Sequence, residues 1–313
     1  GGAGFIGANF IHYWFKKRPG DKIVNLDKLT YAADLSNLKK FEDNPNYSFI
    51  KGDIVDKEVV KKAANDVDVI VNFAAETHVD NSINDSSVFI RSNIMGVHTL
   101  LEVVREKSIR FHQVSTDEVY GSLQLTSKKK FNENSKYSPK NPYSATKAAA
   151  DHLVNAYFNT YKLPVTISNC SNNYGPFQHP EKLIPKTIIS ALNDRPVPVY
   201  GAGMQVRDWI YVEDHCSAIE KIIEKGEYGQ TYLIGANGEK TNLDVVKKIL
   251  NILGKSEKLI KFVNDRPGHD VRYAIDARKI KMELGWKSET TFEEGIKNTI
   301  KFYKDNIKRY ESY

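Results

Sequence analysis

The chain begins with a run of glycines, and this run constrains the fold more than any other feature. The first seven residues, GGAGFIG, fit GxxGxxG through Gly1, Gly4 and Gly7, and they also fit GxGxxG starting from Gly2. Glycines at this spacing let the chain turn tightly and let backbone N–H groups approach a pyrophosphate. A helical pattern follows at residues 8–17, so a phosphate would lie at the positive end of that helix. A plain tight turn is the alternative, because glycine turns are common.

An acidic residue at a suitable distance supports the dinucleotide interpretation. Residues 22–26 have the pattern of a strand, and Asp27 follows it directly, 20 positions after Gly7. A carboxylate at this place accepts hydrogen bonds from the adenosine ribose 2′-OH and repels a 2′-phosphate, which favours NAD over NADP. The adjacent Lys28 weakens this preference. We also expect a strand before Gly1, because the sheet requires one there.

Short apolar runs typical of β-strands alternate with longer helical patterns in the first half of the chain. The runs lie at residues 22–26, 47–50, 67–73, 110–115 and 164–167, and the helical patterns at residues 88–105 and 143–161. This alternation indicates crossover units that build a parallel sheet covered on both faces. We therefore expect an α/β fold with a Rossmann-like doubly wound parallel sheet.

The composition changes after Asn169, where prolines and loops become frequent. We expect residues 1–169 to form the NAD-binding Rossmann domain, and residues 170–313 to form a smaller C-terminal α/β lobe that binds the substrate. A segment near residues 207–235 is expected to return to the first domain. Residues 292–310 have an amphipathic pattern and are predicted to form a helix.

Composition and charge exclude several classes of protein. Hydrophobic residues make up 41% and charged residues 27% of the chain, which is typical of a folded soluble protein. The two cysteines have no CxxC spacing, which favours a reducing cytoplasmic location over a disulfide scaffold. No apolar run approaches the roughly 20 residues of a membrane helix. The net charge of +6 comes from lysines scattered among acidic residues, which argues against nucleic acid but suits an anionic substrate.

Tyr143 and Lys147 stand four residues apart in a helical pattern, so their side chains share one face. A free tyrosine is a poor base at neutral pH because its pKa is about 10. An ammonium about 4 Å away, at an effective dielectric constant of about 20, stabilises the phenolate by roughly 4 kcal/mol before desolvation is subtracted. We therefore interpret Tyr143 as a base assisted by Lys147. The alternative is an ordinary amphipathic helix surface, because the chain contains 17 tyrosines.

Three polar residues, Thr116, Asp117 and Glu118, follow the strand pattern at residues 110–115. The carboxyl end of a parallel strand is where α/β sheets build their sites. Two adjacent carboxyl groups can hold different protonation states, so that one acts as an acid and the other as a base. The alternative is a helix N-terminus that is capped by Ser115 or Thr116 and carries acids beside its dipole.

Taken together, these motifs resemble the extended short-chain dehydrogenase/reductase superfamily and, within it, the dTDP-glucose 4,6-dehydratases. The resemblance covers essentially the whole chain. Besides the glycine turn and residues 114–121, it is carried by residues 25–31, 52–54, 72–80, 170–176, 181–185, 207–209 and 265–270. The Thr116-Asp117-Glu118 trio is its most specific element, since related sugar-nucleotide epimerases usually lack the Asp-Glu pair.

The resemblance implies a hydro-lyase that converts dTDP-glucose to a 4-keto-6-deoxy sugar nucleotide with NAD. Tyr143, helped by Lys147, would take the proton of the 4-OH while a hydride leaves C4. Glu118 would take the C5 proton, Asp117 would protonate the departing 6-hydroxyl, and the hydride would return to C6. Thr116 would donate a hydrogen bond to the C4 oxygen.

The resemblance also implies binding residues. NAD would contact Gly1, Gly4, Phe5, Ile6, Gly7, Asp27, Lys28, Leu29, Thr30, Asp53, Ile54, Ala74, Ala75, Ser92, Tyr143, Lys147 and Asn173. The nucleotide sugar would contact Thr77, Thr116, Asn172, Lys182, Leu183, Pro198, Val199, Tyr200, Arg207, Asn242, Arg266 and His269. Arg207 and Arg266 suit a diphosphate because a guanidinium offers forked donors. Alternatively, each arginine forms only an ion pair at the protein surface. No metal site is expected, because the histidines lack HExxH or a similar spacing.

The chain departs from the family pattern at four places. It has Ala33-Asp34 where the family usually has Gly-Asn, and Asn81 where arginine is usual. Thr77 replaces the more usual serine and Ser92 a threonine. Two other functions stay open from sequence: a sugar-nucleotide 4-epimerase or decarboxylase of the same fold, and a non-catalytic NAD sensor or scaffold. The resemblance further implies a homodimer, with residues 88–105 and 143–161 in a four-helix interface.

Overall fold

The computed structural model describes residues 1–265 and 268–310. Its main sheet has four parallel strands in the order β3-β4-β5-β9. These strands are β3 (Val69–Asn72), β4 (Arg110–Thr116), β5 (Val165–Cys170) and β9 (Thr231–Ile234). Beside it, β1 (Ile23–Asp27) and β2 (Tyr47–Lys51) form a parallel pair. The α/β parallel architecture is thus confirmed.

The single continuous sheet that the sequence predicts is divided into two among the described residues. Gly1 lies between the carboxyl ends of β1 and β3: its amino group donates to the Leu26 carbonyl at 2.5 Å, and its Cα packs against the backbone of Phe73 and Ala74. The strand expected before Gly1 stays a prediction.

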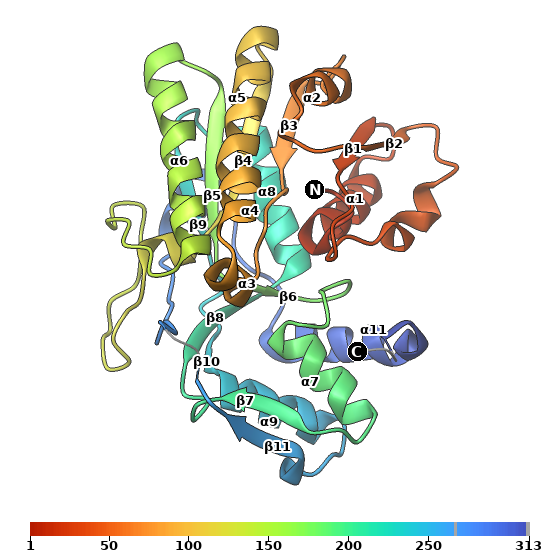
Figure 1. The fold of residues 1–313 in the computed structure, drawn as a ribbon, viewed down its shortest axis with the longest axis vertical. Helices are drawn as coiled ribbons and strands as arrows, with labels where there is room; N and C mark the ends of the chain where they lie inside the picture. The colour runs from red at the N-terminus through yellow and green to blue at the C-terminus, as the bar shows by residue number, and fades with distance from the viewer. Residues whose placement is uncertain (266–267, 311–313) are drawn as a thin grey trace.

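Both faces of the main sheet are buried, because successive side chains of a strand point to opposite faces. Phe111 of β4 belongs to a core cluster with residues of α5 (Gly96–Lys107) and α6 (Pro142–Tyr161). Val114 packs on the other face with α1 (Phe5–Lys17) and α8 (Val212–Lys225). Figure 1 shows α5 and α6 side by side along the main sheet.

The helix predicted at residues 88–105 is interrupted. The structure has α4 (Ser87–Phe89), a π-helical segment (Ile90–Met95) and then α5. Asn93 explains why the irregular segment is held in place: its buried side chain accepts from the Glu76 N–H at 2.9 Å and donates to the Thr146 hydroxyl at 2.9 Å. Such π-helical turns occur frequently at functional sites.

Figure 1 shows the second group of elements below the main sheet, with α7 and α9 beside β7 and β11. Its parallel pair consists of β7 (Val197–Tyr200) and β11 (Ile260–Val263), and a second sheet has the order β10-β8-β6. Its other strands and helices are β6 (Asn172–Tyr174), β8 (Val206–Tyr211), β10 (Glu239–Thr241), α7 (Leu183–Leu192), α9 (Asn242–Ile252) and α11 (Phe292–Asp305). The smaller helices elsewhere are α2 (Lys57–Ala63), α3 (Val79–Asn84) and α10 (Arg278–Leu284).

Two segments late in the chain meet the first part of the molecule. α8 packs against α1, and β9 extends the main sheet beside β5. The helix predicted at residues 292–310 ends at Asp305 and is followed by a 3-10 turn (Ile307–Tyr310). The division into domains at residue 169 stays a proposal.

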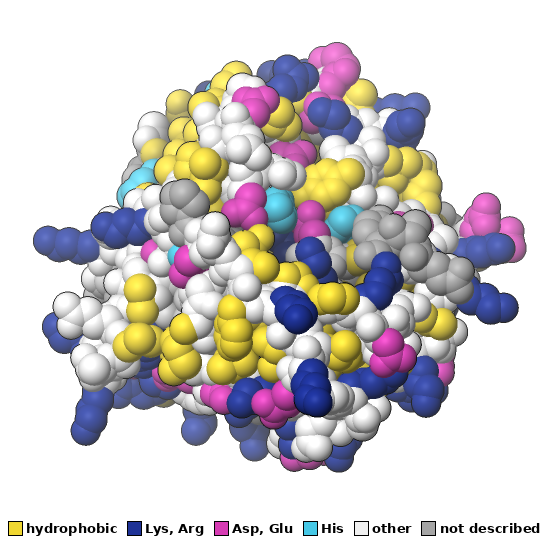
Figure 2. All heavy atoms as spheres, turned by 60° about the horizontal axis from the view of Figure 1, so that its bottom comes forward, with side chains coloured by type: hydrophobic (Ala, Val, Ile, Leu, Met, Phe, Trp, Pro, Cys, Tyr) yellow, Lys and Arg dark blue, Asp and Glu magenta, His cyan; other side chains and the backbone are white. Residues whose placement is uncertain are grey.

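Figure 2 turns the lower group of elements toward the viewer and shows Lys and Arg side chains interspersed with Asp and Glu. No helix among the described residues is both long and apolar enough to cross a membrane.

Candidate active site

A cleft opens at the carboxyl ends of the parallel strands and collects most of the predicted site residues. A cavity of about 320 Å³ holds the glycine turn, Tyr143 and Lys147. A second cavity of about 450 Å³ continues into the lower elements. The two cavities share seven of their lining residues: Thr77, Glu118, Asn172, Asn173, Gln178, Glu181 and Lys182. The two cavities therefore form one continuous cleft.

The glycine turn packs so closely that side chains cannot replace two of its glycines. A Cβ on Gly1 would lie 2.4 Å from the Ala74 nitrogen, and a Cβ on Gly7 would lie 2.4 Å from the Gly1 carbonyl oxygen. Gly4 is the N-cap of α1, and no side chain caps this helix end. Backbone N–H groups at the positive end of α1 thus face the cleft, as anion binding requires.

Asp27 ends β1 as a buried carboxylate beside the glycine turn. One oxygen accepts from the Ala3 N–H at 2.9 Å, and the other accepts from the Leu29 N–H at 2.8 Å. These two bonds fix the carboxylate relative to the turn. Leu29 itself has a φ of 60° and is absent from the residues that line the cavity, so the structure does not place its side chain where the resemblance implied.

Asp53, which follows β2 and lines the cleft, pairs with Lys28 at 2.9 Å. Burial acts to raise the pKa of Asp53, but hydrogen bonds from Lys28 and the Val55 N–H outweigh it and hold the pKa below its usual range. Arg91 adds a further positive charge, 3.7 Å from the Asp53 carboxylate. The charge of Asp53 is therefore compensated within the protein.

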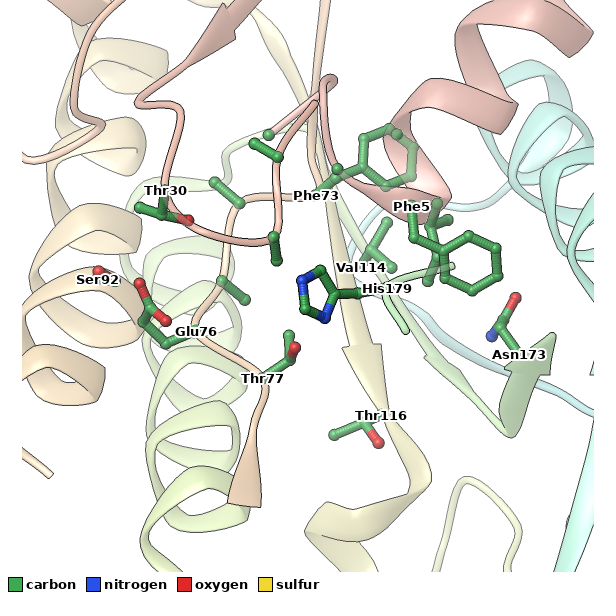
Figure 3. Close-up of a pocket in the computed structure, with 18 of the residues that line it drawn as sticks. Phe5, Thr30, Phe73, Glu76, Thr77, Ser92, Val114, Thr116, Asn173 and His179 are labelled. Carbon is green, nitrogen blue, oxygen red and sulfur yellow. The ribbon is translucent and has the colours of Figure 1, made fainter. Parts of the chain in front are cut away.

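Figure 3 shows side chains that line the pocket. Thr30, Glu76 and Ser92 lie on one side and Phe5 and Asn173 on the other. The structure thus brings together, on this cavity, every described cofactor contact of the resemblance except Leu29.

Tyr143 and Lys147 lie in the first turns of α6, which starts with a capping box at Asn141 and a proline. Both side chains are buried and line the cleft. Burial, followed by the Glu118 carboxylate, raises the pKa of Tyr143 well above its usual range, while a hydrogen bond with Thr116 opposes the shift. The Lys147 ammonium donates to the Val114 carbonyl at 2.8 Å. Desolvation thus outweighs any lowering of the Tyr143 pKa, and the assistance by Lys147 stays a prediction.

Thr116 ends β4, and Asp117 begins a 3-10 turn (Asp117–Tyr120). The Thr116 hydroxyl accepts from the Glu118 N–H at 3.3 Å, so the capping role considered from the sequence is also present. Thr116 and Glu118 line the cleft, whereas Asp117 is absent from its lining residues. Asp117 is buried just behind them, and burial followed by the neighbouring Glu118 charge raises its pKa well above the usual range.

Asp151 was missed by the sequence analysis, although it stands four residues after Lys147 on the same helix. Its carboxylate is buried and accepts from the Ser115 hydroxyl at 2.8 Å and from the Asn169 amide at 3.1 Å. Burial raises the pKa of Asp151 and lowers that of Lys147, and the attraction between the two charges opposes both shifts. The spacing of four residues between Lys147 and Asp151 was the sequence signal that could have identified Asp151.

The second cavity collects most of the predicted sugar-nucleotide contacts. Its lining includes Thr77, Asn172, Lys182, Leu183, Pro198, Tyr200, Arg207, Asn242 and His269. Thr116 lines the first cavity instead. The prediction that Val199 contacts the nucleotide sugar is wrong. Its side chain is 1% exposed and packs in the core with Val246 and Leu250, because alternate residues of β7 face opposite sides. Arg266 lies outside the described residues.

Arg207 is buried in this second cavity, so a surface ion pair is wrong for it. Its guanidinium donates to the Val206 carbonyl at 2.9 Å and to the Asp270 carbonyl at 2.8 Å. It also lies 4.3 Å from the Tyr273 ring centroid. A positive charge is thus held in place on the wall of the cavity.

The polar cleft residues that were not predicted as site residues include Glu76, Gln178, His179 and Glu181. Glu181 contacts Tyr31 at 3.3 Å, and both His78 and His179 at 3.7 Å. These contacts join three loops across the mouth of the cleft. Glu76 and Glu181 lie within segments that carry the family resemblance, which was the only sequence signal for them.

The described residues fit a dinucleotide and its partner substrate. Four buried polar atoms of residues that line the cleft have no hydrogen-bond partner in the described part of the chain: Ser171 Oγ, Asn172 Oδ1, Gln178 Oε1 and Trp209 Nε1. Buried polar atoms are normally paired, so unpaired ones along a cleft indicate a ligand that satisfies them. In the same described part, no group of three or more His, Cys, Asp or Glu side chains is placed to hold a metal ion.

Comparison with known proteins agrees with this geometry. Residues 1–299 match the family model described as GDP-mannose 4,6 dehydratase. The chain is 48% identical to dTDP-glucose 4,6-dehydratase of Neisseria gonorrhoeae, over 100% of this chain and 96% of that protein. The solved structure of DesIV, a dTDP-glucose 4,6-dehydratase from Streptomyces venezuelae with NAD and TYD bound, is 40% identical with a TM-score of 0.96, covering 100% of this chain and 98% of that one.

The fold by itself does not separate dehydratases from epimerases. UDP-glucuronic acid 4-epimerase from Bacillus cereus, solved with UDP-glucuronic acid and NAD, is 26% identical with a TM-score of 0.91, and 97% of each chain is covered. The discrimination therefore depends on the side chains that line the cleft and on sequence identity over the full length.

Proposed function

This chain belongs to the GDP-mannose 4,6 dehydratase family and, within it, to the dTDP-glucose 4,6-dehydratases, and from that premise we propose how its residues carry out the reaction. The enzyme is an NAD-dependent hydro-lyase that removes water from dTDP-glucose and forms dTDP-4-keto-6-deoxyglucose. One observation supports the assignment of roles most directly. Thr116 and Glu118 at the end of β4 share a cleft with Tyr143, and Asp117 is buried directly beside them.

The glycine turn, Asp27 and Asn173 would hold NAD. Bound NAD would supply the hydride acceptor for C4 of the sugar and the hydride donor for C6, and its oxidised ring would add a positive charge that favours a phenolate. Tyr143 takes the proton of the 4-OH, and the Lys147 ammonium stabilises the charge that forms. The Thr116 hydroxyl orients the C4 oxygen next to Tyr143.

Asp117 and Glu118 divide the elimination between them. Burial raises the pKa of Asp117, which favours the protonated carboxyl group that a donor to the departing 6-hydroxyl needs. Glu118 faces the cleft and takes the C5 proton, which the neighbouring 4-ketone has made acidic. Water leaves with the oxygen of the 6-hydroxyl and the proton of Asp117. When the hydride returns to C6 of the resulting 5,6-double bond, Glu118 gives its proton back to C5, which completes the 4-keto-6-deoxy product.

The nucleotide part of the substrate would lie in the second cavity. Arg207, held by two carbonyls, offers a fixed positive charge there, and Lys182 offers a second one. Guanidinium groups suit a diphosphate because their donors are arranged as a fork. Asn172 and Asn242 add amide groups to the same wall.

Absorbance in alkali tests the proposed function, because 4-keto-6-deoxy sugars develop a near-ultraviolet band there. Purified protein incubated with dTDP-glucose should give this band. The double variant Asp117→Asn with Glu118→Gln should lose it while retaining NAD. A wild-type protein that gives no band, or one that only interconverts C4 epimers, would exclude dehydration. A variant that loses NAD together with activity would show that the two acids have a structural role.

We further propose that the protein acts as a homodimer in the cytoplasm. Met95, which is 51% exposed, precedes α5, and Tyr161, which is 46% exposed, ends the neighbouring α6. Large exposed apolar side chains on adjacent helices favour an interface. Cys170 and Cys216 are both free, as is usual for a reducing compartment.

A further inference from the structure

The 3-10 turn at Ile307–Tyr310 contacts the cofactor side of the molecule from the far end of the chain. Arg309 hydrogen-bonds through one guanidinium nitrogen to the carboxylate of Asp34 and, at 2.6 Å, to the side-chain oxygen of Asn37. Both acceptors belong to the segment that follows β1 and precedes β2. A positive charge near the C-terminus thus joins the part of the molecule that contains the glycine turn.

Asp34 connects this contact to the expected adenosine ribose site. The Asp34 N–H donates to the Ala3 carbonyl at 3.0 Å. The Ala3 N–H in turn donates to the Asp27 carboxylate at 2.9 Å. The neighbouring Ala33 lines the cofactor cavity directly. Two hydrogen bonds therefore separate the residue that holds Arg309 from the carboxylate that would accept the ribose hydroxyls.

The turn itself is anchored, so it can hold Arg309 in place. Tyr310 is 6% exposed and packs against Tyr303 with ring centroids 5.0 Å apart. Tyr303 of α11 donates a hydrogen bond to the carbonyl of Gln178, another cleft residue. Phe302 packs edge-on against Phe177 at 5.0 Å. The C-terminal segment thus contacts Gln178 on the wall of the cofactor cavity and, through Arg309, the segment next to Ala33.

We propose that Arg309 is a positioning residue for NAD, acting through Asp34 and Asn37 on the loop that borders the adenosine ribose site. This inference rests on the proposed function, since it concerns the NAD site. It also gives a role to Asp34, where the family pattern has asparagine. An asparagine would keep the backbone bond to Ala3 but lose the ion pair with Arg309.

The ion pair is partly exposed, with side-chain exposures of 28% for Arg309 and 47% for Asp34. Such partly exposed pairs contribute little to stability. Arg309→Gln is therefore expected to fold, and its effect should appear in cofactor affinity. We expect NAD to bind about threefold to tenfold more weakly, with kcat at saturating NAD and KM for dTDP-glucose unchanged.

The experiment compares four proteins: wild type, Arg309→Gln, Asp34→Asn and the double variant. Lys308→Gln is the matched control, because Lys308 is the adjacent, exposed cation. NAD retained after gel filtration and the NAD dissociation constant of stripped protein are measured, followed by kinetics with dTDP-glucose. The double variant should bind NAD no more weakly than Arg309→Gln alone, because each of the two changes already removes the ion pair between Arg309 and Asp34. Should Arg309→Gln fail to fold, Arg309→Lys and Asp34→Asn carry the same test.

The inference is overturned if Arg309→Gln binds NAD as tightly as Lys308→Gln. It is also overturned if KM for dTDP-glucose rises in step with the NAD dissociation constant, or if the two substitutions act additively. A wild-type protein that does not bind NAD would instead contradict the proposed function. The two failures are therefore distinguishable.

Discussion

Burial decides the direction of the pKa shift for two side chains at the site, whereas at Asp53 hydrogen bonds and opposite charges outweigh it. Tyr143 and Asp117 both have a raised pKa with burial as the largest cause. For Asp117 this suits a proton donor. For Tyr143 it opposes formation of the phenolate, which the charge of bound NAD would favour in the proposed reaction.

Tyr143→Phe should slow the first oxidation about 10²–10⁴-fold, the range over which a positioned acid or base contributes to a rate. NAD binding should persist, because the ring remains in place. Single-turnover formation of NADH after mixing with dTDP-glucose measures this step. The matched control is Tyr161→Phe, a 46% exposed tyrosine on the same helix. Near-normal oxidation by the Tyr143 variant would remove this residue as the base.

At the scale of elements, polar groups inside the main sheet connect neighbouring strands. His112 of β4 is buried between β4 and β5, with ring nitrogens 2.9 Å from the Thr166 hydroxyl and 3.0 Å from the Ser168 hydroxyl. Burial lowers the pKa of His112 from 6.5 to about 3. The folded protein therefore holds this imidazole neutral at a pH where an unfolded chain would protonate it.

This shift predicts a loss of stability in acid. Below pH 6.5 the unfolded chain binds a proton at His112 that the folded chain does not bind until about pH 3. The free energy of unfolding therefore falls as the pH drops below 6.5, because protonation of His112 stabilises only the unfolded chain. Between pH 7.5 and 5.0 this lowers it by roughly 2 kcal/mol. Urea unfolding at the two pH values measures it. His112→Gln, although less stable overall, should lose about 2 kcal/mol less over this interval, and an equal loss in both proteins would contradict the assignment.

The order of the elements could be predicted because strands and helices of this fold have distinct hydrophobic periods. Two departures could not be predicted in the same way. The π-helical segment at Ile90–Met95 depends on Asn93 contacting Glu76 and Thr146, which are distant in sequence. The buried position of Val199 depends on the register of β7, and a shift by one residue would reverse it.

The candidate site was predictable to the extent that its residues occur in compact motifs. The glycine turn, the Thr116-Asp117-Glu118 trio and the Tyr143–Lys147 pair each lie within a few residues. Contacts that join separate segments, such as Glu181 with Tyr31 and His78, have no local pattern. Whether Asp117 faces the cleft or lies behind it also depends on packing, which spacing does not record.

For the whole molecule, the cleft depends on contacts between distant segments of the chain. β9 and α8 return to the main sheet, and the C-terminal turn reaches the segment after β1. Helices α5 and α6 pack against each other on the opposite side of the sheet from α1 and α8. Their exposed side is therefore available for association.

The proposed homodimer makes a prediction about assembly. Met95 precedes α5 and is 51% exposed. A charge at the centre of an apolar interface is costly because it must be desolvated without a partner. Met95→Glu should therefore shift the mass measured by light scattering after gel filtration from two chains to one. Met282→Glu provides the matched control, because Met282 lies on α10 and is 77% exposed, so this variant should keep the mass of wild type. In the proposed interface, the two introduced glutamates would lie close together and repel each other. A dimer that persists in Met95→Glu would therefore place the interface on another face of the molecule.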